Sequence, residues 1–189
     1  MIPEKHGKLT VIRDEDIKDL ENIQKLHRID FVMVPYILSK DDVKEVWRRL
    51  NFLDKTVIIS RLDDKRSFED FWEITNESGG IMLNRNSLSH SISPEKLHQL
   101  QNFLTEQCNL MGKPIIVETT NMNGQNLHAN AREISDIELS VLSGIDVILL
   151  DQETSNGPAP VDAIKFVSRA LAQAETLIDP GKRYLKMKR

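Results

Sequence analysis

The sequence predicts an α/β fold in which about five parallel strands alternate with helices. Short apolar runs recur along the 189 residues, and the segments between them have helical periodicity with capping residues at their starts. The clearest run lies in Thr56–Asp64, which reads T-V-I-I-S-R-L-D-D. A β-branched run of this kind is typical of a strand buried on both faces of a parallel sheet.

The expected strands share an apolar composition and a short length. In order they are Asp30–Val34, Thr56–Ser60, Gly80–Leu83, Pro114–Val117 and Asp146–Leu150. Their starts recur at intervals of roughly 24 to 34 residues, the size of one βα unit in a barrel. A complete eight-unit barrel needs about 250 residues. Periodicity therefore fits either a partial TIM (β/α) barrel or a self-contained open sheet of five strands with helices on both faces.

Residues that typically start helices lie before the first of these runs and between the others. A first helix is expected from Asp14 to about Lys25, before the first strand. Ser39 is a hydroxyl cap followed by acidic residues, and Ser67-Phe68-Glu69-Asp70 resembles a capping box. Ser93-Pro94-Glu95 places a cap and a proline where another helix begins.

The helix ends are marked as well. Gly112 and Gly144 each stand shortly before a strand, where left-handed caps end helices. Pro160 begins a last helix that is expected to continue through about Ile178, with apolar residues at helical spacing on one side.

Composition limits the classes of function. The formal net charge is −4, and no basic patch with interleaved aromatic residues is present, so we expect no nucleic-acid partner. No apolar run approaches membrane-spanning length, and the N-terminus lacks the apolar core of a signal peptide. The single cysteine, Cys108, excludes an internal disulfide. We expect a cytoplasmic protein with one domain, residues 1–178, and a solvated basic tail, residues 179–189.

Charged residues of both signs follow the second expected strand. Arg61, Asp63 and Asp64 lie at its carboxyl end, where ligands bind in α/β proteins. A cation and carboxylates at this place suggest a site for an anionic substrate and a metal ion. A simple ion pair at the strand exit is the alternative, because structural ion pairs are also common.

Several stretches, in this order, resemble one family. They are Leu9–Glu21, Asp30-Phe31-Val32 with Asp42-Val43, Ile58-Ile59-Ser60-Arg61-Leu62-Asp63, Gly80-Ile81-Met82 with Arg85 and Ile92-x-Pro94-Glu95-Lys96, Cys108-Asn109-x-x-Gly112-Lys113-Pro114, and Asp146, Leu149, Glu153-Thr154 and Gly157. Together they resemble the second half of the catalytic barrel of pyruvate kinase, over about Leu9 to Ile178. The resemblance implies a partial TIM barrel without the N-terminal strands, the lid domain and the C-terminal domain of that family.

The resemblance implies a chemistry. The family is a glycolytic transferase that moves a phosphoryl group from phosphoenolpyruvate to ADP, with Mg²⁺ and K⁺ as cofactors. Such catalysis consists mainly of positioning and of neutralising charge. By resemblance, Arg61 matches the lysine that faces the transferred phosphoryl group, and Thr119 matches the threonine beside the reacting carbon.

The same resemblance exposes departures from the family pattern. Asp63 matches a metal-binding glutamate and is one methylene shorter. Ser87 matches the second metal-binding acid, so we expect weak metal binding, because a neutral hydroxyl is a poor ligand for a hard cation. The backbone amides of Asn86 and Ser87 match those that hold the substrate carboxylate.

Three interpretations follow from these departures. The chain is an active pyruvate kinase or a piece of one, a non-catalytic paralogue (a pseudoenzyme), or a truncated product. The altered site favours an inactive or impaired chain. A partial barrel exposes strand edges and the apolar inner face of its sheet. We therefore expect the isolated chain either to be unstable or to associate with another copy of the chain or with a full-length pyruvate kinase.

Overall fold

The computed structural model describes residues 4–5, 8–9, 11–119 and 131–178. The chain forms two compact units, residues 1–94 and residues 95–189. The basic tail expected at residues 179–189 lies outside the described residues. The assignment of residues 1–178 to one domain stays a prediction.

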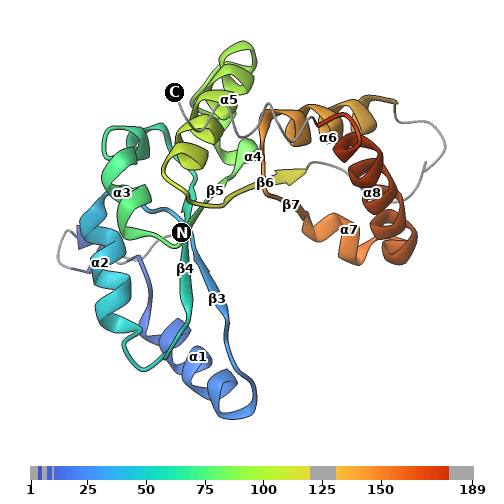
Figure 1. Ribbon diagram of the computed structural model, residues 1–189. Coiled ribbons are helices and arrows are strands. Elements are labelled where there is room, and N and C mark those ends of the chain that lie inside the picture. The colour runs from blue at the N-terminus through green and yellow to red at the C-terminus, as the bar shows by residue number, and fades with distance from the viewer. Residues whose placement is uncertain (1–3, 6–7, 10, 120–130, 179–189) are drawn as a thin grey trace. The chain divides into compact units, whose positions relative to one another are not determined.

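Unit 1 contains three parallel strands (Figure 1). They are β3 (Phe31–Val34), β4 (Val57–Leu62) and β5 (Gly80–Leu83). Met33 lies beside Ile59 in the register of the first pair, and Ile59 lies beside Gly80 in the register of the second. A short antiparallel pair, β1 (Glu4–Lys5) and β2 (Lys8–Leu9), precedes them.

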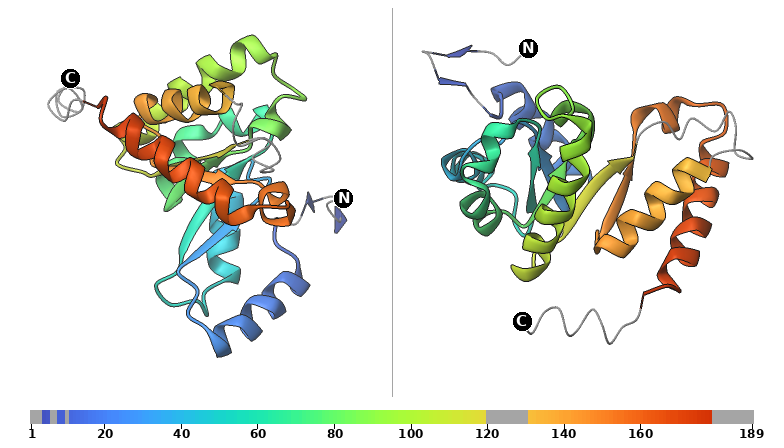
Figure 2. Two further views of the ribbon diagram at one scale, coloured as in Figure 1. Left: turned by 90° about the vertical axis from the view of Figure 1, so that its right-hand side faces the viewer. Right: turned by 90° about the horizontal axis from the view of Figure 1, so that it is seen from above.

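The helices of unit 1 lie before, between and after these three strands. They are α1 (Asp14–Leu26), α2 (Lys40–Arg49), a 3₁₀ helix η1 (Lys65–Phe68), α3 (Phe71–Glu77) and the single turn α4 (Arg85–Leu88). Helices α2 and α3 lie on one side of the strands (Figures 1 and 2). The buried side chains of these strands and helices include Val34, Val43, Val46, Ile58, Ile74, Ile81 and Leu83.

Of the expected helix starts, the one at Ser39 is confirmed and the one at Ser67 is not. Ser39 is the N-cap of α2, where its Oγ accepts a hydrogen bond from Asp42 N and the Asp42 carboxylate accepts one from Ser39 N. The capping box expected at Ser67 is wrong. Ser67 is buried inside η1, and its hydroxyl donates a hydrogen bond to Ile37 O at 2.8 Å. This bond joins η1 to the loop between β3 and α2. Helix α3 begins later, after Asp70.

Unit 2 repeats the alternation. Helix α5 (Pro94–Leu110) leads to β6 (Ile115–Thr119), α6 (Ala131–Ser143), β7 (Val147–Leu150), α7 (Gln152–Asn156) and α8 (Pro160–Glu175). Strands β6 and β7 are parallel. Helices α6 and α8 pack on each other through Ile137, Val141 and Val167, with Ile148 and Leu150 of β7 against this cluster.

All five expected strands are present, and the differences are at their ends. Strand β4 continues to Leu62, two residues beyond the expected end, so Arg61 lies within the strand. Pro160 begins the last helix as expected, but α8 ends at Glu175. Gly112 and Gly144 have φ angles of +66° and +95°, which confirms both as left-handed caps. Among the described residues, no helix has the length and apolar character needed to span a membrane.

Candidate functional site

The candidate site of unit 1 lies at the carboxyl end of β4. Strand alternation places Arg61 and Asp63 on the same side of the chain, two residues apart. The Asp63 side chain is 0% exposed and the Arg61 side chain is 28% exposed. Arg61 Nε lies 3.0 Å from Oδ2 of Asp63 and forms a hydrogen bond with it. The ion pair considered as an alternative in the sequence is therefore present.

Asp63 is the centre of a buried hydrogen-bond network. Besides Arg61, the backbone N–H of Tyr36 donates to Oδ2 at 2.8 Å, and the side-chain amide of Asn84 donates to Oδ1 at 2.8 Å. A carboxylate has about four lone-pair positions on its two oxygens. Three donors thus occupy most of the acceptor capacity of Asp63, and the network joins the ends of β3, β4 and β5.

Asn84 was missed by the sequence reasoning. It follows the four apolar residues of β5 and is buried. Besides its bond to Asp63, its Oδ1 accepts a hydrogen bond from Ser87 N at 3.2 Å and so caps α4. Its position in the sequence could have identified it: a polar residue directly after a fully buried strand is itself buried and needs hydrogen-bond partners.

Tyr36 is a second residue that the sequence reasoning missed. Its φ of +57° is unusual for a residue with a side chain, and it turns the backbone N–H toward Asp63. The Cζ of Arg61 lies 5.9 Å from the centroid of the Tyr36 ring, within the range of a cation–π contact. Asp63 and Tyr36 therefore hold the guanidinium on two sides. The terminal nitrogens of Arg61 have no hydrogen-bond partner within the part of the chain that the structure describes.

The expected substrate loop forms the short helix α4. Asn86 is exposed and Ser87 is half-buried. The Ser87 amide is engaged by Asn84, so it serves the capping of α4 in this structure. The hydroxyl of the neighbouring Ser89 donates to Asn86 O at 2.7 Å. The substrate-binding role of Asn86 and Ser87 stays a prediction.

Thr119 belongs to unit 2. It is the last residue of β6, and its backbone lies beside Leu150 in the register with β7. Arg61, Asp63, Asn86 and Ser87 all belong to unit 1. The catalytic role of Thr119 therefore also stays a prediction.

The residues around Asp63 fit a divalent metal ion poorly. The guanidinium of Arg61 already lies against both carboxylate oxygens, and a second cation would meet a like charge there. The neighbouring Asp64 accepts hydrogen bonds from Arg66 Nε and Nη2, at 3.1 and 2.9 Å, and these bonds lower the pKa of its carboxyl. Across the described ranges, no group of three or more His, Cys, Asp or Glu residues is arranged to hold a metal ion.

Comparison with known proteins places this architecture in one family. The barrel domain of pyruvate kinase matches residues 2–164. Pyruvate kinase of Eimeria tenella is 32% identical over 90% of this chain and 33% of its own length. The rice protein called pyruvate kinase 2, cytosolic (Oryza sativa subsp. indica) is 32% identical over 92% of this chain and 34% of its own length. The chain thus spans about a third of the length of these relatives.

Solved structures agree with the sequence matches. A crystal structure of a pyruvate kinase from Cryptosporidium parvum superposes with a TM-score of 0.87 at 30% identity, over 96% of this chain and 39% of that chain. A structure of Cryptosporidium parvum pyruvate kinase in complex with ADP gives a TM-score of 0.86 at 30% identity, over 95% and 38%. The fold is accordingly a partial TIM barrel, with five parallel strands alternating with helices. The chain belongs to the pyruvate kinase family.

Proposed function

We propose that this chain retains the phosphate-binding corner of a pyruvate kinase at Arg61 and does not transfer the phosphoryl group by itself. The observation that carries the proposal is the arrangement of Arg61 and Asp63. Asp63 is fully buried and bonded to Arg61 Nε, which orients the guanidinium and leaves its two terminal nitrogens for a ligand. A guanidinium fork held in this way suits bidentate binding of a phosphate or a carboxylate.

The substrates of the family reaction are the proposed ligands of this site. Phosphoenolpyruvate carries a phosphate and a carboxylate, and Arg61 offers it a permanent positive charge at the end of β4. Asn86 and Ser87 follow β5, the strand next to β4. The backbone amide of Asn86 is the proposed contact for the carboxylate, and the Ser87 amide would join it only by leaving its bond to Asn84. ADP is the acceptor by family membership alone, and Thr119 is the proposed residue beside the reacting carbon.

The loss of transfer has a physical reason. The family reaction needs Mg²⁺ and K⁺ to neutralise charge that develops around the transferred phosphoryl group. Asp63 has most of its acceptor capacity occupied by Arg61, Tyr36 and Asn84, and Ser87 offers no charge. A cytoplasmic place for the protein is proposed from its cytosolic rice relative.

The test is a coupled assay for pyruvate formed from phosphoenolpyruvate and ADP, with Mg²⁺ and K⁺ present. We expect the purified chain to show no turnover above the rate without protein. Turnover that is lost in Arg61→Ala and kept in Arg66→Ala would contradict the proposal, because it would show a working transfer site. Arg66 is the matched control, since it is an exposed arginine five residues away that pairs with Asp64.

A second candidate function is that of an interaction partner, either of a full-length pyruvate kinase or of another copy of this chain. The favouring observation is the exposure of large apolar side chains on β3, β7 and α1. Co-purification of the tagged chain with a full-length pyruvate kinase tests whether the two proteins associate.

A further inference from the structure

Tyr36 has an unusual backbone conformation in the loop between β3 and α2. Its φ is +57°, which lies in the left-handed region that residues with bulky side chains rarely adopt. Such a conformation persists only where the surrounding structure fixes it, and examples cluster at binding and active sites. The contacts that fix Tyr36 therefore indicate what its side chain does.

Two hydrogen bonds attach this loop to the segment that follows β4. The N–H of Tyr36 donates to Oδ2 of Asp63 at 2.8 Å, and the hydroxyl of Ser67 donates to Ile37 O at 2.8 Å. Asp63, Ser67 and Ile37 are all buried, so both bonds are shielded from water. The backbone is thus held on both sides of the Tyr36 Cα atom, and these bonds fix the direction in which the side chain leaves the loop.

The Tyr36 side chain lies against Arg61. The Cζ atom of Arg61 lies over the ring, 5.9 Å from its centroid, at a distance where the ring quadrupole attracts a cation. Tyr36 is 44% exposed, so its ring is not part of the buried core of unit 1. Its hydroxyl makes no hydrogen bond in the part of the chain that the structure describes. The contact with the guanidinium is thus the electrostatic interaction that this ring makes.

We propose that Tyr36 is a positioning residue for the anion site at Arg61, an inference that rests on the function proposed for that site. The bond from Nε to Asp63 fixes one corner of the guanidinium, and the ring of Tyr36 restricts how far the rest of the group can swing. The two terminal nitrogens are then presented in one orientation, which suits an anion with two oxygens, such as a phosphate monoester or a carboxylate. Ordering the guanidinium before the ligand arrives lowers the entropic cost of binding.

A role in the fold alone predicts a different pattern. If Tyr36 served only the loop, replacing it would change stability, while the guanidinium of Arg61 would keep its environment and its affinity for anions. The proposal predicts that the environment of Arg61 changes whenever the ring is removed, even where the loop keeps its conformation. Variants that separate the ring from the backbone distinguish the two roles.

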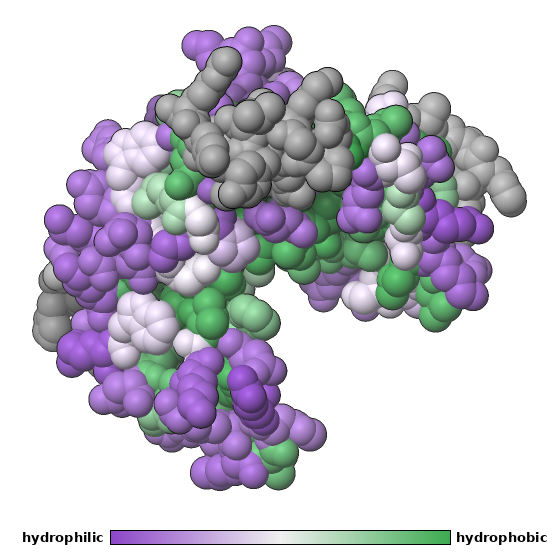
Figure 3. All heavy atoms as spheres, viewed as in Figure 1, coloured by the Kyte–Doolittle hydropathy of each residue, from purple (hydrophilic) through white to green (hydrophobic). Residues whose placement is uncertain are grey.

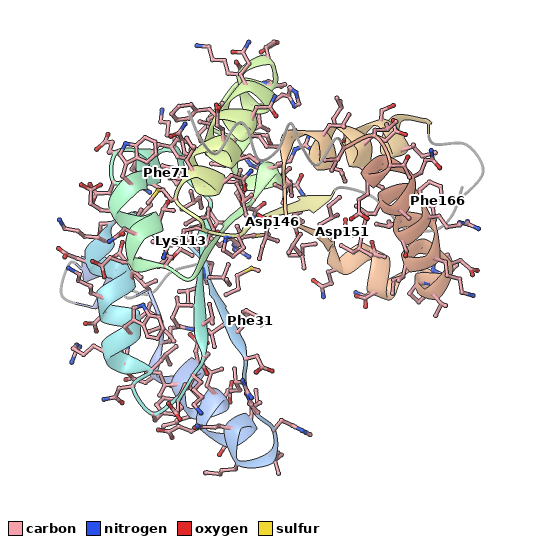
Figure 4. The ribbon with its side chains drawn as sticks, in the orientation of Figure 1. Phe31, Phe71, Lys113, Asp146, Asp151 and Phe166 are labelled. Carbon is pink, nitrogen blue, oxygen red and sulfur yellow. The ribbon has the colours of Figure 1, made fainter. Side chains whose placement is uncertain are left out.

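Two substitutions achieve this separation. Tyr36→Phe keeps the ring and loses only the hydroxyl. Tyr36→Asn removes the ring, and asparagine is among the residues that best tolerate the left-handed conformation. The control is Phe31→Asn, because Phe31 is an aromatic residue on β3 that is 68% exposed. Figure 4 shows its side chain projecting from β3, and Figure 3 shows hydrophobic surface over this strand.

NMR of the ligand-free chain gives the first test, after circular dichroism has shown that all variants are folded. The Nε–Hε signal of Arg61 is assigned by its loss in Arg61→Ala. We expect a ring-current shift of this signal in the wild-type chain, in Tyr36→Phe and in Phe31→Asn, and no such shift in Tyr36→Asn. A signal at the same position in Tyr36→Asn and in the wild-type chain would overturn the proposal.

Calorimetric titration with phosphoenolpyruvate in EDTA gives the second test. We expect Tyr36→Asn to bind about fivefold more weakly than the wild-type chain, from the energy of a cation–π contact. Tyr36→Phe and Phe31→Asn should bind within about twofold of the wild-type chain, since both keep the ring contact. Equal affinities of Tyr36→Asn and the wild-type chain, or equal losses in Tyr36→Phe and Tyr36→Asn, would refute the role of the ring.

The two tests separate this inference from the function on which it rests. If no variant binds phosphoenolpyruvate, the wild-type chain included, the function proposed for Arg61 is contradicted. The NMR measurement needs no ligand, so it still decides whether Tyr36 positions the guanidinium.

Discussion

The side-chain amide of Asn84 donates to Oδ1 of Asp63 at 2.8 Å, and both side chains are buried. This bond joins the ends of β4 and β5 and fixes the carboxylate that orients Arg61. The residue that organises the site is thus one for which the family resemblance assigned no role.

Replacing Asn84 tests how much this bond contributes. Asn84→Ala removes a donor to a buried carboxylate and the cap of α4, and hydrogen bonds to charged groups contribute about 1.5–3 kcal/mol. We expect the free energy of unfolding in urea to fall by about 2–3 kcal/mol. Asn86→Ala, at an exposed position two residues away, is expected to change it by less than about 0.5 kcal/mol. Equal losses in the two variants would contradict the network.

Gly79 is predicted to be intolerant of a side chain for steric reasons. A Cβ at Gly79 would meet Val57 Cγ1 and would lie 3.2 Å from Ile58 O. Overpacking of this kind costs about 1–3 kcal/mol, so Gly79→Ala should lower the unfolding free energy by that amount. Adding Val57→Ala should recover part of the loss, and urea unfolding of the double variant measures it.

Gly112 gives the contrasting case. Its φ is +66°, and no atom lies within 4 Å of the place of a Cβ. Gly112→Ala should cost about 1 kcal/mol through backbone strain alone. Val57→Ala should not rescue it. If Val57→Ala restored stability to both glycine variants, or to neither, the clash with Val57 would not be the cause of the loss in Gly79→Ala.

The carboxyl of Asp64 is predicted to titrate below its ordinary pKa of 3.8, because Arg66 donates hydrogen bonds to it. A depressed folded-state pKa means that the contribution of this carboxylate to stability is present at neutral pH. It is lost as the pH falls through the folded-state pKa. NMR titration should show the pKa of Asp64 rising toward 3.8 in Arg66→Ala. An unchanged pKa would exclude the Arg66 bonds as the cause.

Cys108 is predicted to be inert in the folded chain. Burial, with a smaller contribution from Asp146, raises the pKa of its thiol to about 12. A disulfide reagent such as DTNB at pH 8 should therefore label the native chain only slowly, and should label it completely in urea. Rapid stoichiometric labelling of the native chain would contradict this burial.

The fold was largely predictable from the sequence, and the site only partly. Five apolar runs and residues such as Ser39, Pro160 and Gly112 have strong local signals, so the strands and most helix limits were placed within a few residues. Ser67 failed because tertiary contact decided its role: its hydroxyl bonds to Ile37 O, 30 residues away. The pairing of Arg61 with Asp63 was foreseen, since the two residues share a strand end.

The rest of the site depends on contacts between distant segments. Tyr36 and Asn84 lie 27 and 21 residues from Asp63, and both donate to it. Neither the left-handed backbone of Tyr36 nor the direction of the Asn84 amide follows from local sequence. These contacts bring three strand ends together, and only the fold reveals them.

The most direct test of the account is a calorimetric titration with phosphoenolpyruvate in the presence of EDTA. The account predicts that the wild-type chain and Arg66→Ala bind the ligand without a divalent metal, and that Arg61→Ala loses binding by about tenfold or more. Binding that requires Mg²⁺, or that is unchanged in Arg61→Ala, would contradict the assignment of Arg61 as the anion-binding residue.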